Sequence, residues 1–278
     1  MSMNAFHARR HKPGPATVRE SLPAFAPSAG VRADVLLAAQ LNCSRTKARH
    51  LIEAGKARHA DAVIGKPAQA LPGDSQLTLA EDACGAFVSR GGDKLSGALR
   101  HTRMSVAGCR CLDVGQSAGG FTDCLLAAGA EQVVGVDVGH GQLHPKLLVD
   151  PRVRAFTGIN CRRLTAADLA DALPENGFER IVADVSFISL ALILPCLPPL
   201  LAADGQMLLL VKPQFEVGRK DVGKGGIVRD ARLYAEVEAG LRRRCADLDL
   251  EVRQWFASSL VGGDGNREFF IWTSKARN

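Results

Sequence analysis

From residue 109 onward, short runs rich in apolar and β-branched residues alternate with longer segments of helical character. These strand-like runs occupy residues 109–115, 132–138, 153–158, 180–185, 206–212, 250–259 and 267–274. Repeated strand and helix units favour a mostly parallel sheet with helices on both faces. The last two runs follow one another without a helix, which indicates a hairpin at the sheet edge. We therefore predict an α/β, Rossmann-like fold with a seven-stranded, mostly parallel sheet.

Nineteen consecutive uncharged residues begin at Val185. Their number is close to what a helix needs to cross a bilayer. Three prolines crowd the end of the run, and each removes a backbone donor for which hydrocarbon offers no substitute: Pro195, Pro198 and Pro199. We interpret the run as a buried helix over residues 189–197 that joins two of the predicted strands, and we expect no stable membrane association.

Charge is distributed unevenly along the chain. Residues 1–60 hold ten Lys and Arg against three Asp and Glu, a net charge of +7, whereas the whole chain carries +6. The remaining residues are therefore close to neutral. A compact basic module beside a near-neutral body suggests a polyanion as partner. The N-terminus also lacks the apolar stretch of a secretory signal, so we expect the protein in the cytoplasm.

The eight cysteines are scattered along the chain, and no Cys-x-x-Cys pair occurs. This distribution favours reduced thiols packed as small apolar side chains, and it argues against a zinc site or a disulfide framework. We therefore expect no metal ion.

Residues 1–30 contain four prolines and no apolar period, so we expect a disordered tail. From residue 31, apolar residues recur at helical spacing in a first short helix: Val35, Leu36 and Ala39. Ser44 can cap a second helix, which ends at Gly55 and whose inward-facing residues are Ala48, Leu51 and Ile52. A small β unit follows. These patterns predict a small α+β domain over residues 31–80, followed by a linker over residues 81–91.

The opposite face of the second helix presents Arg45, Lys47 and Arg49. With Arg-x-Asp before it and Pro-Gly-Asp after it, the segment resembles the small RNA-binding domain of the ribosomal-protein S-four type. That resemblance implies that the three basic side chains contact RNA phosphates, which supplies affinity with little sequence selectivity. An ordinary helical hairpin with solvated charges is the alternative.

A glycine-rich turn and a helix follow the strand at residues 109–115. Gly115, Gly119 and Gly120 let the backbone pass close to a ligand, and ligands of open parallel sheets bind in the crevice at the strand ends. Asp137 ends the next strand, 24 residues after Asp113, where a carboxylate can accept hydrogen bonds from ribose hydroxyls. The Gly-x-Gly-x-x-Gly fingerprint of dinucleotide enzymes is absent.

The motif Asp-x-Gly-x-x-x-Gly-Gly-Phe-Thr resembles the S-adenosylmethionine loop of class I methyltransferases, and specifically that of the FtsJ-like ribose methyltransferases. The resemblance implies an S-adenosyl-L-methionine site formed by Asp113, Gly115, Ser117, Gly119, Gly120, Phe121, Asp137 and Asn160. Gln116 stands where alanine is expected. A tight strand-to-helix turn without a ligand is the alternative.

A second glycine-rich segment, residues 218–225, comes within one residue of a Walker A loop. It ends in Gly225 where Ser or Thr would bind magnesium, and it lies several residues beyond the strand that ends at Lys212. We therefore reject it as a nucleotide loop. We interpret it as a basic loop that closes over RNA or cofactor, with three RNA-binding residues: Arg219, Lys220 and Lys224.

Charged residues stand at the ends of two further predicted strands. Asp184 ends the fourth strand and Lys212 the fifth, which directs both side chains into the crevice beside the glycine-rich turn. Lys94 opens the helix before the first strand, and Glu268 falls within the last strand. In this order the four residues resemble the Lys-Asp-Lys-Glu tetrad of FtsJ-like 2′-O-methyltransferases.

Taken with the N-terminal module and the segments SRGGDKL, DVGQSAGGFTD and VKPQFE, the chain resembles the TlyA family, whose members are described both as hemolysins and as ribosomal RNA methyltransferases. The resemblance covers residues 32–274. It implies a class I methyltransferase domain over residues 92–278 that methylates ribose 2′-hydroxyls of ribosomal RNA with S-adenosyl-L-methionine. The implied partners are ribosomal RNA or ribosomal subunits, and no DNA is expected.

The chemistry of ribose methylation suits these residues, because a ribose hydroxyl is a very weak acid. Lys212 is the candidate that takes its proton or stabilises the alkoxide, with Asp184 orienting it. Lys94 would position the hydroxyl, and Glu268 would balance the charge.

Other methyl acceptors fit less well. Adenine-N6 enzymes resemble one another in an Asp-Pro-Pro-aromatic motif, whereas this chain has Asp184-Val-Ser-Phe. Cytosine-C5 enzymes need a cysteine near that strand end, and Cys196 lies twelve residues beyond Asp184. Two rival functions are a membrane-lytic hemolysin, which no amphipathic or apolar span supports, and an RNA-binding protein with an inactive methyltransferase domain, against which the intact tetrad argues.

Overall fold

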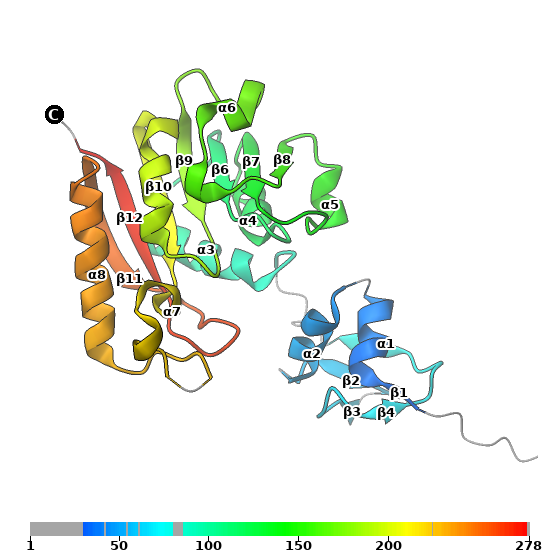
Figure 1. The fold of residues 1–278 in the computed structure, drawn as a ribbon. Coiled ribbons are helices and arrows are strands. Elements are labelled where there is room, and N and C mark those ends of the chain that lie inside the picture. Colours follow the sequence, from blue (N-terminus) through cyan, green and yellow to red (C-terminus); the bar gives the residue numbers. More distant parts are fainter. Residues whose placement is uncertain are drawn as a thin grey trace, which may run out of the picture. The chain divides into compact units, whose positions relative to one another are not determined.

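The computed structural model describes residues 30–41, 43–53, 55–60, 62–79, 86–223 and 225–276. The chain divides into two compact units, residues 1–83 and residues 84–278, and each unit is described by itself (Figure 1). Residues 1–29 of the predicted tail and residues 81–85 of the predicted linker lie outside the described residues.

The first unit has the α+β character that the sequence predicts. Its helices are α1 (Ala33–Gln40) and α2 (Arg45–Glu53). Its short strands are β1 (Val31–Arg32), β2 (Ala57–His59), β3 (Ala62–Val63), β4 (Ala70–Leu71) and β5 (Leu77–Leu79). β1 pairs with β4, and β2 lies antiparallel between β3 and β5.

The core of this unit lies between its two helices. Ala48 and Ile52 of α2 are buried, which confirms the face predicted for that helix. Of the three residues noted at helical spacing in α1, Leu36 is buried, whereas Val35 and Ala39 are exposed; the buried apolar set is Ala33, Leu36 and Leu37. Both sets have helical spacing, and the pattern of α1 alone could not show which one packs against α2.

A buried carboxylate joins the two helices. Asp34 is 1% exposed and forms ion pairs with Arg32, at 2.9 Å, and with Arg45 of α2, at 3.0 Å. Hydrogen bonds from Arg32 and then from Arg45 lower the pKa of Asp34 to about 2. Arg45, predicted from the sequence to bind RNA, is therefore also part of the fold of this unit.

The larger unit is built on a seven-stranded sheet with the order β11-β12-β10-β9-β6-β7-β8. Its strands are β6 (Arg110–Val114), β7 (Gln132–Asp137), β8 (Val153–Thr157), β9 (Phe178–Ala183), β10 (Leu201–Val211), β11 (Leu250–Ala257) and β12 (Phe269–Lys275). β8, β7, β6, β9 and β10 are parallel, and β12 lies antiparallel between β10 and β11. The predicted sheet and the pairing of its last two strands are confirmed.

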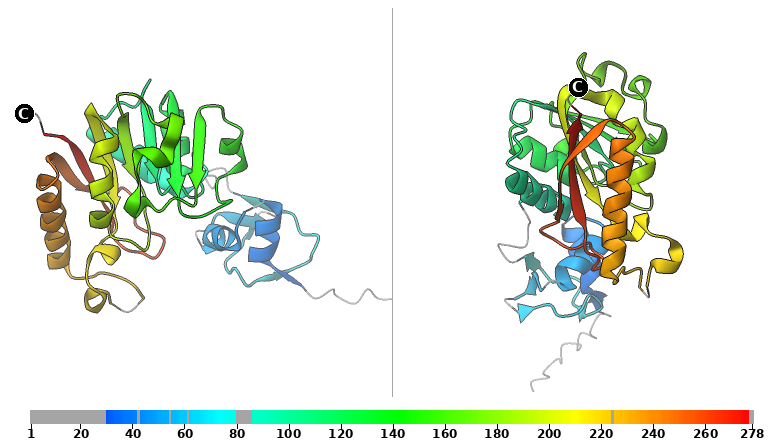
Figure 2. Two further views of the ribbon diagram at one scale, coloured as in Figure 1. Left: turned by 45° about the horizontal axis from the view of Figure 1, so that its top comes forward. Right: turned by 90° about the vertical axis from the view of Figure 1, so that its left-hand side faces the viewer.

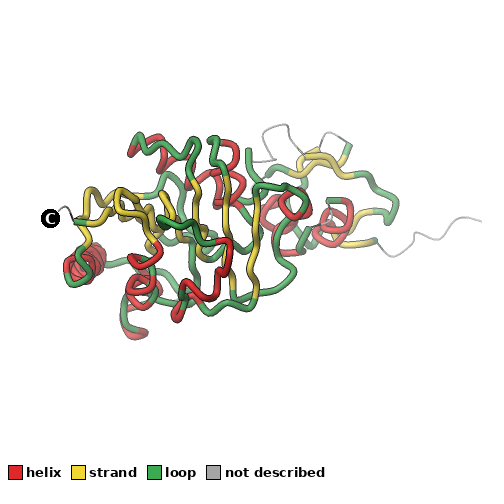
Figure 3. Tube along the Cα trace, turned by 90° about the horizontal axis from the view of Figure 1, so that it is seen from above, coloured by secondary structure: helices red, strands yellow, loops and turns green. Residues whose placement is uncertain are grey.

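Helices cover both faces of the sheet, and strand residues alternate between two apolar cores (Figure 3). One face packs against α3 (Arg90–Thr102), α4 (Gly120–Ala127) and α5 (Pro145–Leu148). The other packs against α6 (Ala166–Leu169) and α8 (Ala231–Ala246), and α8 lies alongside β11 (Figure 2). A short helix, α7 (Pro213–Glu216), begins where β10 ends.

The helix predicted over residues 189–197 is wrong. The chain instead forms three 3₁₀ turns, Leu190–Leu192, Leu194–Cys196 and Pro198–Leu200. The prolines explain the difference, because Pro195, Pro198 and Pro199 cannot donate the amide hydrogen bonds of a continuous α-helix. Leu190, Leu194 and Leu197 are nevertheless buried against the sheet, as expected for this apolar run. No helix within the described part of the chain has the length and apolar character needed to cross a membrane.

Candidate active site

The turn after β6 brings the backbone of two neighbouring strands into close approach. Gly115 has a φ of +83°, and a Cβ there would lie 2.5 Å from the carbonyl oxygen of Asp184. The amide of Asp184 in turn donates to the carbonyl of Val114 at 3.0 Å. Both the left-handed backbone and the lack of space require glycine at this position. The predicted cofactor loop and Asp184 therefore share one corner of the domain.

The segment SRGG at the start of α3 packs onto the same corner. A Cβ on Gly120 would overlap the Ser89 hydroxyl, and a Cβ on Gly91 would lie 3.5 Å from Oδ2 of Asp184. The glycines thus allow the first turns of α3 and α4 to meet closely. Lys94, one helical turn after Gly91, thus lies on a helix that packs against α4.

Asp137, the last residue of β7, holds two loops together. Its Oδ2 accepts a hydrogen bond from the amide of Ser117 at 2.8 Å, and its Oδ1 accepts one from the amide of Gly139 at 2.7 Å. The Ser117 hydroxyl also bonds Gln142 at 3.1 Å. Each carboxylate oxygen of Asp137 keeps a further lone pair, and the residue is half-buried, so the carboxylate can still accept hydrogen bonds from a ligand.

Asp113 lies beneath the loop and is fully buried. Its Oδ2 accepts a hydrogen bond from the Thr122 hydroxyl at 2.7 Å. The same hydroxyl accepts one from the side-chain amide, Nε2, of Gln116 at 2.8 Å. Among the described residues, Oδ1 of Asp113 has no hydrogen-bond partner. Burial, aided by the nearby charges of Asp184 and Asp137, raises the pKa of Asp113 to about 7. Asp113 therefore supports the loop from below, through Thr122.

Gln116, which stands where alanine was expected, has a structural role in this arrangement. It is 5% exposed, and its side chain fills the space above Gly135 of β7, where any Cβ would overlap it. Gly135 thus leaves room for the glutamine side chain, and the hydrogen bond from Gln116 to Thr122 holds that side chain in place.

Four charged side chains form two ion pairs at the strand ends. The Nζ of Lys212, directly after β10, lies 2.6 Å from Asp184 and donates to the Ser186 hydroxyl at 2.7 Å. The Nζ of Lys94 lies 2.5 Å from Glu268, and both side chains are at least nine-tenths buried. Glu268 immediately precedes β12 and so does not lie in the strand where the sequence placed it. The structure brings all four predicted tetrad residues to one region.

Lys94, Lys212 and Glu268 line a common cavity of about 410 Å³. Two aromatic side chains, Phe187 and Phe215, line it as well, with their ring centroids 5.3 Å apart. Phe187 is 92% exposed and has a φ of +65°. From the sequence, Asp184-Val-Ser-Phe was compared with the adenine-N6 motif, and Phe187 was assigned no role. An aromatic residue three positions after the strand-end Asp184 is the signal that could have indicated it.

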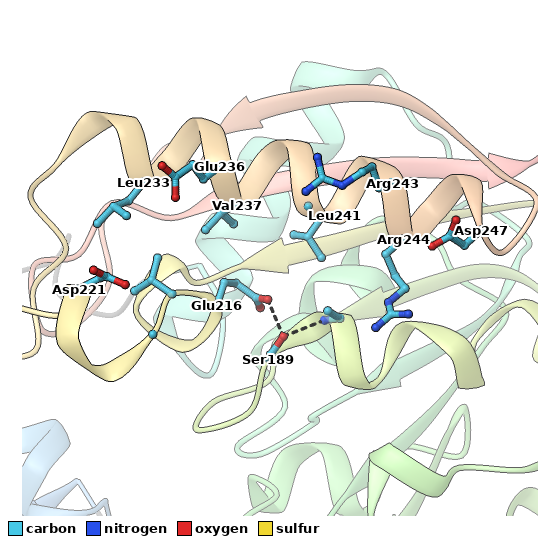
Figure 4. A pocket seen from close by; sticks show the side chains of 14 residues that line it. Ser189, Glu216, Asp221, Leu233, Glu236, Val237, Leu241, Arg243, Arg244 and Asp247 are labelled. Atoms are coloured by element: carbon cyan, nitrogen blue, oxygen red, sulfur yellow. Dashed lines mark hydrogen bonds between the residues drawn. The ribbon is translucent and has the colours of Figure 1, made fainter.

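A second cavity, of about 500 Å³, lies beside α8 and contains none of the predicted catalytic residues (Figure 4). Its half-buried carboxylate, Glu216, accepts hydrogen bonds from the Ser189 hydroxyl and the Leu190 amide, both at 2.6 Å. Burial raises the pKa of Glu216. Since both carboxylate oxygens hold the turn that begins at Leu190, we assign Glu216 a structural role and place the chemistry in the first cavity.

The remaining predicted residues occupy varied surroundings. Phe121 is 3% exposed and packs in the core against Phe270, so it supports the loop and does not face the crevice. Asn160 is exposed and accepts a hydrogen bond from the amide of Arg162 at 3.1 Å. Lys220 is exposed, whereas Lys224 and the side chains of Arg219 and Lys47 lie outside the described residues.

Within the described ranges, no cluster of three His, Cys, Asp or Glu residues could hold a metal ion.

Comparisons with known proteins agree with this geometry. The model of the FtsJ-like methyltransferase family matches residues 87–275. A relative from Mycobacterium tuberculosis, named 16S/23S rRNA (cytidine-2′-O)-methyltransferase TlyA, is 44% identical over 229 residues, which cover 82% of this chain and 84% of the relative. The chain belongs to the TlyA family.

Two further relatives of this TlyA-family chain are named as hemolysins, which is the other description given to members of the family. Hemolysin A of Brachyspira hyodysenteriae is 35% identical over 81% of this chain and 92% of that protein. A solved structure from Streptococcus thermophilus, described as a candidate hemolysin, is 36% identical, has a TM-score of 0.72 and covers 90% of both chains. The expected membership of the TlyA family is confirmed, and the larger unit is an FtsJ-like methyltransferase domain.

The raised pKa of Asp113 predicts a particular pH dependence of stability. The folded protein holds the Asp113 proton up to about pH 7, whereas the unfolded chain releases it near pH 4. The free energy of unfolding therefore falls between these two pH values. Asparagine does not titrate, so the stability of Asp113→Asn relative to the wild type should rise by roughly 1–4 kcal/mol across this window.

Urea unfolding followed by tryptophan fluorescence measures this difference, because Trp255 and Trp272 both lie in the larger unit. A difference that stays constant from pH 4 to pH 8 would contradict the assignment of the raised pKa to Asp113.

Proposed function

We propose that this TlyA-family protein transfers a methyl group from S-adenosyl-L-methionine to a ribose 2′-hydroxyl of ribosomal RNA. The observation that carries the proposal is the pair of lysine–carboxylate contacts, Lys212 with Asp184 and Lys94 with Glu268, around one cavity. These are the residue types and the order that the tetrad of FtsJ-like 2′-O-methyltransferases requires. Their assembly at one site favours this function over an inactive methyltransferase domain.

In this proposal Lys212 acts on the hydroxyl. Contacts with Asp184 and Ser186 fix the direction of its Nζ, so that it can take the proton or stabilise the developing alkoxide. Lys94, held by Glu268 in a buried pair, adds a second positively charged group that positions the oxygen. The bound cofactor would supply the methyl group, and the cavity walls would exclude water from the reacting atoms.

The cofactor loop fits an adenosyl ligand in two respects. Gly115 and Gly119 adopt left-handed backbone conformations that shape the tight turn between β6 and α4, at the end of the sheet where ligands of open parallel sheets bind. Asp137, at the adjacent strand end, retains lone pairs for ribose hydroxyls of the cofactor. We assign Ser117, Gly120 and Asn160 to the rim of this site, and Asp113 and Phe121 to its support.

The substrate assignment rests on the cavity and on the relatives. The exposed ring of Phe187 beside Phe215 offers a stacking surface for an unstacked base, as is common in the recognition of single-stranded RNA. The Mycobacterium tuberculosis relative is named as a cytidine-2′-O-methyltransferase of 16S and 23S rRNA. We therefore propose a cytidine of ribosomal RNA as the target, and with it a cytoplasmic location.

A hemolytic activity is the rival function, and the Brachyspira hyodysenteriae relative is named Hemolysin A. The two functions separate experimentally. Ribose methylation mapped on ribosomal RNA from cells with and without the protein should reveal one or more lost sites, whereas purified protein should release no dye from protein-free liposomes. Dye release together with an unchanged methylation map would refute the proposal.

The first unit is proposed to dock ribosomal RNA through the basic face of α2. Arg45 is held by the buried Asp34, so its replacement would also disturb the fold, whereas Arg49 pairs with the half-exposed Glu53 on the surface of α2. Changing Lys47 and Arg49 together to Glu should weaken RNA binding and flatten its salt dependence, because fewer counterions are released. Filter binding across a salt series measures both quantities. An unchanged slope and affinity would mean that RNA binds through another surface.

Replacing Asp137 with Ala should weaken cofactor binding. The loss of a carboxylate that accepts ribose hydroxyls costs about 1–3 kcal/mol, or roughly one to two decades in affinity. Calorimetric titration of S-adenosyl-L-methionine measures the change, and Asp171→Ala serves as the control, because Asp171 is exposed and pairs with Arg154. Equal affinities of the Asp137 variant and the wild type would remove the assignment.

Replacing Lys212 with Ala should reduce methyl transfer by about 10²–10⁴-fold in single-turnover assays, with RNA and cofactor affinities nearly unchanged. Lys212→Arg should not restore the rate if Lys212 accepts the proton, because a guanidinium stays protonated. Lys275→Ala is the matched control, since that lysine binds the Leu201 carbonyl at the far end of β10. A near wild-type rate for the arginine variant would leave Lys212 as a fixed positive charge only.

A further inference from the structure

Asn266 is a fully buried amide in the segment that leads into β12. Its Oδ1 accepts a hydrogen bond from the amide of Val228 at 2.9 Å. Its Nδ2 donates to the carbonyl of Gly226 and to Oδ2 of Asp264, both at 2.9 Å. Its own carbonyl accepts from the amide of Gly262 at 2.8 Å. A side chain must offer both a donor and an acceptor to make these contacts, which an aspartate or an aliphatic residue cannot do.

These bonds connect two loops that line the active-site cavity. Gly226 and Val228 directly follow the basic loop, residues 218–225, whose Lys220 is exposed. Asp264 belongs to a second loop, residues 258–268, which ends at Glu268. Gly226 and Asp264 both line the cavity. The side chain of Asn266 thus joins the loop proposed to contact RNA to the loop that carries a tetrad residue.

The second loop determines where Glu268 lies. A Cβ on Gly262 would lie 2.8 Å from Oδ1 of Asp264 and 2.8 Å from Oε1 of Glu268, so both carboxylates crowd the same glycine. Lys94 holds Glu268, and the amide of Asn266 holds Asp264. Without that amide, Asp264 would keep only the longer hydrogen bonds from the side-chain amide of Gln214, at 3.4 Å, and from the backbone amide of Asn266, at 3.3 Å. The two like-charged groups over Gly262 would then be held less firmly, and the Lys94–Glu268 pair could shift.

We propose that Asn266 is a positioning residue, which fixes the basic loop relative to the Lys94–Glu268 pair so that RNA held by the loop is presented to the cavity. The inference rests on the proposed function, and it deepens that function by assigning a coupling role to a residue outside the tetrad. A purely structural Asn266 would stabilise the domain without linking the loop to catalysis, and a double-mutant cycle distinguishes the two roles.

The cycle combines Asn266→Ala with Lys220→Ala in the full chain, with two readouts: RNA affinity across a salt series, and the single-turnover rate at saturating RNA. Asn266→Ala should lower the rate at least about tenfold and leave S-adenosyl-L-methionine affinity unchanged. Lys220→Ala should weaken RNA binding and reduce the salt slope by about one in the wild-type background. In the Asn266→Ala background, the effect of Lys220→Ala on both readouts should largely disappear.

Ser274→Ala is the control, since Ser274 lies at the opposite end of β12 and its substitution also removes side-chain hydrogen bonds, one accepted from Arg253 at 3.0 Å and one donated to the carbonyl of Lys275 at 3.3 Å. Its combination with Lys220→Ala should be additive. Asn266→Asp, which keeps the size of the side chain but cannot donate to Gly226, should show the same coupling as Asn266→Ala and serves if the alanine variant does not fold.

Additive effects of Asn266 and Lys220 substitutions on both readouts would overturn the coupling role. Failure of the proposed function has a different signature, because the wild type would then not methylate RNA at all. In that case the RNA-affinity arm of the cycle still decides whether Asn266 fixes the basic loop.

Discussion

Parallel pairing of β6 with β7 and β9 is the constraint on which the site depends. Val114 is in register with Val136 on one side and with Ala183 on the other, so the residues that follow each strand emerge at one edge of the sheet. Gly115, Asp137 and Asp184 come together for this reason, although 69 residues separate the first from the last. The glycine turn then lets the loop pass against the Asp184 backbone, which no residue with a side chain permits.

The ion pairs add a second level of constraint. Lys94 and Glu268 lie 174 residues apart in sequence, on α3 and directly before β12, and their contact is buried. Removing one member of such a pair leaves an uncompensated buried charge, which costs about 3–5 kcal/mol. The Lys212–Asp184 pair is more exposed, with side chains 11% and 22% exposed, so it is better able to exchange partners when a substrate enters. In the proposed function, the buried pair therefore provides the fixed geometry, and the less buried pair provides the reactive group.

Much of this arrangement was predictable from sequence because its signals are local. Strand periodicity located the sheet, and the ends of the strands located Asp137, Asp184 and Lys212. The errors arose where distant packing decides. Pro195, with Pro198 and Pro199 just beyond, replaced the expected helix over residues 189–197 by 3₁₀ turns. In α1, Leu36 packs inward with Ala33 and Leu37 and not with Val35 and Ala39. Asn266 gave no sequence signal, because its role exists only where two loops separated along the chain meet.

Phe187 has a consequence for the balance between stability and activity. A bulky residue in the left-handed region is strained by roughly 1–3 kcal/mol, and a ring that is 92% exposed recovers little of this through burial. Its contact with Phe215 is the compensation that the folded chain itself provides. Glycine or asparagine would suit the backbone better, so folding alone gives no reason for an aromatic residue here. The loop after β9 thus stores backbone strain, and a ligand that contacts the ring in the cavity would offset part of its cost.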